Sequence, residues 1–91
     1  MTQTSIKKIE LRTDPISPAQ CRAARALVGM SQTDLASRAT VARQTIVDFE
    51  RGARVPYPNN LAAIRAALEA AGVEFIAENG GGAGVRLRIR N

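Results

Sequence analysis

The strongest constraint on the fold is the spacing of apolar residues between Gln32 and Arg51, QTDLASRATVARQTIVDFER. Apolar residues recur at helical spacing on either side of a short break: Leu35, Ala36, Ala39, Ile46 and Phe49. Ala36 is small enough to let two helices cross at close approach, and Val41 would fill the turn between them. The stretch therefore predicts two short helices joined by a tight turn.

The outer face of the second of these helices is polar. If Ile46 and Phe49 are buried, Gln44, Val47, Asp48 and Arg51 turn towards solvent. Gln can pair bidentately with adenine and Arg with guanine, and a Val methyl group suits thymine. Asp48 could accept from a cytosine amine or could orient Gln44 or Arg51. The alternative reading is an ordinary solvated helix face.

The stretch resembles the helix-turn-helix of phage-repressor (Cro-like, XRE-type) DNA-binding proteins. The matching residues are Gln32, Leu35, Ala36, Ala39, Val41, Thr45, Ile46, Phe49, Glu50 and Gly52. The resemblance extends from about Pro18 to Gly72. Two positions depart from the family pattern. Thr40 stands where the turn often has glycine, and Ala42 stands where a capping Ser or Thr often opens the second helix.

The resemblance implies a mainly α fold, a four-helix lambda-repressor-like helix-turn-helix domain. It also implies a transcriptional regulator, expected to be a repressor, that binds a pseudo-palindromic operator in double-stranded DNA as a homodimer. The residues expected to read bases are Arg43, Gln44, Val47 and Asp48. Those expected to bind phosphates are Gln32, Thr45, Arg51 and Arg54. Arg25 and Glu50 are expected to form a partly buried ion pair between the first and third helices.

The rest of the chain divides around this domain. We expect an N-terminal arm or short strand at residues 1–15, the DNA-binding domain at 16–72 and a β-hairpin at 73–91 that serves dimerisation. Ile6–Arg12 alternates apolar and polar residues, which suits a strand, and a disordered basic arm is the alternative. The C-terminal hairpin is predicted by two alternating runs around the glycine-rich segment 79–84.

Helix boundaries follow from local signals. Ser17 and Pro18 predict the start of the first helix, and Gly29 predicts its end. The residues of this helix expected to face the core are Cys21, Ala24, Leu27 and Val28. The second helix begins after Ser31. Asn59 or Asn60 would cap a fourth helix over 61–71, and Gly72 would end it.

Composition narrows the class of protein. The 91 residues carry a net charge of +5 without histidine, which favours an anionic partner. Cys21 is the single cysteine and is expected to be a small buried hydrophobe. These residues predict no catalytic set, no metal site and no cofactor, and the chain is expected to be cytoplasmic with no membrane partner. The rival hypothesis is a protein-interaction module, an antitoxin or anti-activator that retains the helix-turn-helix fold and has a protein partner.

Overall fold

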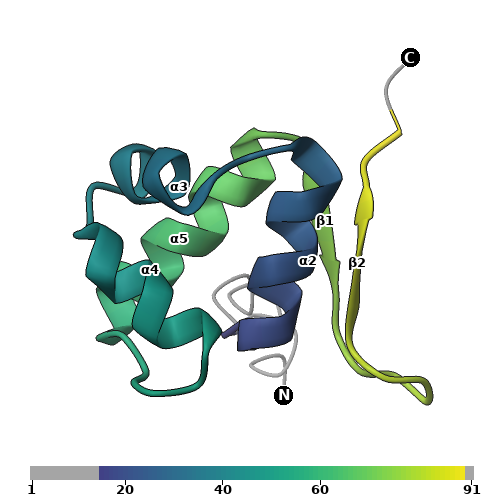
Figure 1. Ribbon diagram of the computed structural model, residues 1–91. Helices are drawn as coiled ribbons and strands as arrows, with labels where there is room; N and C mark the ends of the chain where they lie inside the picture. Colours follow the sequence, from purple (N-terminus) through teal and green to yellow (C-terminus); the bar gives the residue numbers. More distant parts are fainter. Residues whose placement is uncertain (1–14, 90–91) are drawn as a thin grey trace, which may run out of the picture.

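The computed structural model describes residues 15–89 of the chain (Figure 1). Its elements are α2 (Pro18–Val28), α3 (Gln32–Ala39), α4 (Arg43–Glu50), α5 (Pro58–Ala70), β1 (Val73–Ile76) and β2 (Gly84–Leu87). The predicted mainly α fold with a C-terminal hairpin is therefore confirmed. The strand or arm expected around Ile6–Arg12 lies outside the described residues.

The starts of α2 and α3 agree with the sequence prediction. The Ser17 hydroxyl accepts from the backbone N–H of Gln20, and the Gln20 side chain accepts from the backbone N–H of Ser17, which makes a capping box. Gly29 ends α2 in the left-handed conformation, with φ at 66°. Ser31 caps α3 by accepting from the N–H of Asp34.

The tight turn between α3 and α4 has Thr40 at the position where glycine is common in this motif. Thr40 adopts the left-handed conformation, with φ at 59° and ψ at 47°, and its N–H donates to the Ser37 carbonyl at 3.2 Å. This backbone is costly for a β-branched residue. Val41 follows, half-buried against the core as predicted, and Ala42 begins α4 with no side-chain cap.

Two predictions are wrong: one concerns the start of a helix, and the other concerns a residue expected to face the core. The N-cap position of α5 is Tyr57, not Asn59 or Asn60, and its side chain makes no capping hydrogen bond. Pro58 sets this start, because it occupies the first helical position with a fixed φ and holds the preceding residue extended. Leu27 does not face the core, since 41% of it is exposed. It lies seven residues after Gln20 and therefore on nearly the same side of α2, which is the side towards the hairpin.

One hydrophobic core holds the helices together. Its fully buried members are Cys21, Ala24, Leu35, Ile46, Ile64, Leu68 and Val73. Ile16 and Met30, which flank α2 and were not predicted to be in the core, are also buried. Helix α3 packs against both α4 and α5, and α2 packs against α4 and the hairpin. Helix α2 thus lies between α4 and the two strands (Figure 1).

The hairpin pairs β1 and β2 antiparallel, with Val73 opposite Leu87 and Phe75 opposite Val85. A charge pair joins the two strands: the Arg86 guanidinium donates to both carboxylate oxygens of Glu74, at 3.1 and 3.2 Å. The buried Gln20 side chain fastens the hairpin to α2, because its amide donates to the carbonyls of Gly84 at 3.0 Å and Ile76 at 3.5 Å.

Candidate nucleic-acid interface

The inner face of α4 is fixed by burial. Ile46, Phe49 and Glu50 are at most 3% exposed. An eight-residue helix is marginal on its own, so its position depends on this packing. A helix held by its back presents its outer face in one orientation.

Glu50 is the centre of a buried polar network behind α4. Its carboxylate accepts two hydrogen bonds of 2.7 Å from the Nε and Nη2 atoms of Arg25, so the predicted ion pair is present and bidentate. The Cys21 thiol donates to it at 3.1 Å, and the Gln32 amide donates at 3.1 Å. Arg22 also donates to the backbone carbonyl of Glu50. The network joins α2, α3 and α4 through one carboxylate.

The charges in this network shift the pKa values of its members. Burial alone would raise the pKa of Glu50, but the hydrogen bonds from Arg25, Cys21 and Gln32 outweigh it and hold that pKa below its ordinary value. Cys21 has a raised pKa because it is buried and donates to the Glu50 carboxylate. Cys21 is therefore a neutral, buried thiol, in agreement with the sequence prediction.

The outer face of α4 carries a second, exposed set of contacts. Asp48 accepts from the Gln44 amide at 2.9 Å and from Arg51 at 3.3 Å. The hydrogen bond from Gln44, followed by that from Arg51, holds the pKa of Asp48 below its ordinary value, so Asp48 is ionised at neutral pH. Arg43 is exposed at the start of α4, and Val47 is half-buried. The four residues predicted to read bases thus share one helix face or its N-terminal end.

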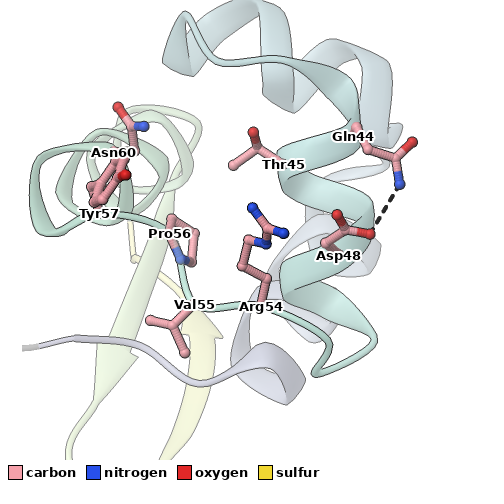
Figure 2. Close-up of a pocket in the computed structure, with 8 residues that line it drawn as sticks. All are labelled: Gln44, Thr45, Asp48, Arg54, Val55, Pro56, Tyr57 and Asn60. Carbon is pink, nitrogen blue, oxygen red and sulfur yellow. Dashed lines mark hydrogen bonds between the residues drawn. The ribbon is translucent and has the colours of Figure 1, made fainter.

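A hollow borders this face on one side (Figure 2). Gln44, Thr45 and Asp48 form the wall on α4. The opposite side is formed by Arg54, Val55, Pro56, Tyr57 and Asn60, from the loop after α4 and the start of α5. The Arg54 guanidinium points into the space between these walls (Figure 2). Thr45 and Arg54, both predicted to bind phosphate, are therefore brought together.

Some features of this region were not predicted. Tyr57 and Val55 are 80% and 75% exposed at the rim, and sequence reasoning did not single them out. Paired prolines at 56 and 58 were the available signal, since they indicate a rigid loop that can form a wall. Gln32 was predicted to bind phosphate, and its side chain lies on the inner side of α3 with its amide on Glu50.

A model of the helix-turn-helix family matches residues 22–74, which is more than half of the chain. The chain belongs to the Cro/XRE-type helix-turn-helix DNA-binding family. In this DNA-binding transcription regulator, α3 and α4 are the two helices of the motif, and members of the family are typically non-enzymatic. A comparison with curated proteins found no match to this chain.

Two further findings concern other classes of site. Among the described residues, no three His, Cys, Asp or Glu side chains are grouped in a way that could hold a metal ion. No helix in residues 15–89 of this regulator has the length and apolar character needed to cross a membrane.

Proposed function

We propose that this helix-turn-helix regulator is a transcriptional repressor that binds a pseudo-palindromic operator as a homodimer and reads it with α4. The observation that carries the proposal is the outer face of α4, where Arg43, Gln44 and Asp48 stand on a helix whose opposite face is locked into the core. In this motif the N-terminal residues of the second helix contact base edges in the major groove.

Gln44 is the side chain best placed to recognise a particular base. Its amide N–H donates to Asp48, which leaves its second N–H and its carbonyl oxygen for a base edge. Adenine presents a matching acceptor and donor in the major groove. Asp48 would then act as a positioning residue that fixes the Gln44 rotamer, while Arg43 reads guanine and Val47 contacts a thymine methyl group.

The phosphate contacts would come from the edges of this surface. Arg54 and Thr45 face the hollow beside α4, where a DNA strand could pass, and Arg51 is exposed at the end of the helix. Gln32 would contribute through its backbone or its remaining amide N–H at the start of α3, since one N–H is bound to Glu50. Phosphate contacts set the position of the protein and carry no base preference.

The test is a selection of bound sites from random duplexes, followed by binding of Gln44→Ala to the best site and its single-base variants. We expect a loss of about 1–3 kcal/mol on the best site and a relaxed preference at one base pair in each half-site. Asp48→Ala should relax preference at that same base pair. Glu78→Ala, in the exposed hairpin loop, is the matched control and should leave the base preference unchanged at every position of the site.

If Gln44→Ala left every base preference unchanged, α4 would not be the reader. The protein-interaction module would then be the better account of the fold. A repressor role is checked separately, by the effect of the intact protein on transcription from a promoter that carries the selected operator.

A further inference from the structure

The carboxylate of Asp48 has two side-chain donors in the free protein, and both use the same oxygen. Its Oδ1 atom accepts from the Gln44 amide at 2.9 Å and from the Arg51 guanidinium at 3.3 Å. Among the residues that line the hollow beside α4, Asp48 is the one acidic side chain (Figure 2). In the proposed complex, this negative charge stands on the face that the phosphates of a duplex approach.

The position of this carboxylate is fixed by the backbone as well. The carbonyl of Asp48 accepts from the N–H groups of Ala53 at 2.8 Å and Arg54 at 3.3 Å, which ties Asp48 to the loop after α4. The Asp48 side chain is 21% exposed, whereas that of Arg51 is 66% exposed. Arg51 is therefore the member of the pair that can turn to another acceptor, because its long side chain is open to solvent.

We infer that Asp48 competes with DNA phosphates for Arg51 and so limits the binding of DNA of any sequence. Arg51 must leave a carboxylate before it can reach a phosphate, and both anions suit the guanidinium fork. The carboxylate left behind then repels nearby phosphates. The inference rests on the proposed function, and it makes Asp48 a determinant of specificity in addition to a positioning residue for Gln44.

This competition has most effect on DNA that lacks the operator. Nonspecific binding comes almost entirely from phosphate contacts, so a penalty on one arginine is not offset by base contacts. On the operator, the charge of Asp48 also strengthens its hydrogen bond from Gln44, which orients Gln44 towards its base. Removal of the charge therefore favours nonspecific binding, whereas on the operator weaker positioning of Gln44 opposes the gain.

The test is DNA binding of Asp48→Asn, measured by fluorescence anisotropy at several salt concentrations on a duplex without the operator. The variant loses the charge and keeps an acceptor oxygen for Gln44. We expect about three- to fivefold tighter binding of this duplex per subunit, the range of an exposed ion pair. The slope of log affinity against log salt should steepen by about one per subunit. On the selected operator the gain should be smaller, so the ratio of the two affinities falls.

Asp34→Asn is the matched control for net charge. It removes an equal charge from an exposed position in the first turn of α3, where Asp34 forms no ion pair within the described part of the chain. Its effect on the nonspecific duplex measures the change in net charge alone. If Asp48→Asn tightened binding no more than Asp34→Asn does, the inference would be overturned.

The part played by Arg51 is tested by a double-mutant cycle. In an Arg51→Ala background, Asp48→Asn should lose most of its gain on the nonspecific duplex, because there is no arginine left to release. The steeper salt slope should disappear as well. A gain as large as that in the parent would mean that Asp48 acts without Arg51, which contradicts the competition.

The same variants separate failure of this inference from failure of the proposed function. If Arg51→Ala weakens DNA binding and Asp48→Asn does not strengthen it, the competition alone is refuted. If Arg51→Ala, Gln44→Ala and Asp48→Asn all leave binding of both duplexes unchanged, the outer face of α4 does not meet DNA. The proposed function and the inference would then both be wrong.

Discussion

At the scale of single residues, Glu50 has the largest structural role in the interface region. Its carboxylate is 3% exposed and holds donors from α2 and α3 behind α4, whereas Arg25 is 19% exposed. A buried pair of this kind need not add net stability over an apolar pair of the same shape. Its loss is costly because the remaining charge stays buried without a partner.

We predict that Glu50→Ala lowers the free energy of unfolding by about 3–5 kcal/mol. Chemical denaturation of Glu50→Ala, Arg25→Met and the double variant gives the coupling between the two side chains. The double variant should be much more stable than the sum of the single losses implies, because no unpaired charge is left. Strict additivity of the two losses would contradict a coupled pair.

The ionisation of Glu50 also predicts how stability depends on pH. Arg25, Cys21 and Gln32 hold the pKa of Glu50 in the folded protein below its ordinary value of 4.5, although burial alone would raise it. Its stabilising contribution is therefore complete above about pH 4.5 and is lost as the pH falls through the folded-state pKa. We predict that the free energy of unfolding decreases with acidification below that point, and that Glu50→Gln flattens the decrease.

The control for this pH effect is Glu74→Gln. Glu74 has a pKa lowered by the hydrogen bonds and charge of Arg86, but its side chain is 45% exposed, so solvent screens the pair. Its replacement should change the acid limb less than Glu50→Gln does. An equal change in both variants would mean that burial of Glu50 has no special weight.

At the scale of helices and turns, the sequence was most informative where one residue type suits one position. Ser17, Gly29 and Ser31 each mark a boundary by a cap or a left-handed backbone, and all three boundaries are confirmed. The start of α5 was misplaced because two candidate Asn caps obscured the simpler signal of Pro58. Capping residues and prolines therefore predict a helix end reliably only where one residue alone suits the position.

Contacts between distant elements were harder to predict. The Arg25–Glu50 pair was expected from the family resemblance. The hydrogen bonds from Cys21 and Gln32 to Glu50 were not, because they depend on how three helices cross. The docking of the hairpin by Gln20 likewise joins residues more than 50 positions apart. The exposure of Leu27 has the same origin, because a periodic pattern shows which residues share a face and not where the neighbouring element ends.

The turn between α3 and α4 offers a prediction at this scale. Thr40 has a φ of 59°, a left-handed backbone that costs a non-glycine residue roughly 1–2 kcal/mol. We predict that Thr40→Gly raises the free energy of unfolding by about 0.5–1 kcal/mol, because the relief of strain exceeds the added freedom of the unfolded chain. Chemical denaturation gives the value. Thr33→Gly, at an exposed position inside α3, is the control and should instead be destabilising.

At the scale of the whole molecule, α2 separates two surfaces. Helix α4 lies on one side of α2 and the hairpin on the other, so the hairpin leaves the outer face of α4 open (Figure 1). For the proposed homodimer we therefore expect two α4 helices on the same face of a duplex, with half-sites spaced by about 34–36 Å or a multiple of it. The selected operator gives this spacing directly.

The net charge of +5 adds a sequence-independent attraction to DNA, and the proposed role of Arg54 can be isolated within it. Arg54 is exposed, and its guanidinium points into the hollow beside α4 (Figure 2). We predict that Arg54→Ala weakens binding to all sequences alike and reduces the slope of log affinity against log salt by about one per subunit, because one phosphate contact is lost.

The measurement is DNA binding at several salt concentrations, on the selected operator and its single-base variants. Arg86→Ala is the matched control, since it removes an equal charge from the hairpin, and its slope should stay close to that of the parent. A shift in preference at one base pair in Arg54→Ala would instead make Arg54 a reader of bases.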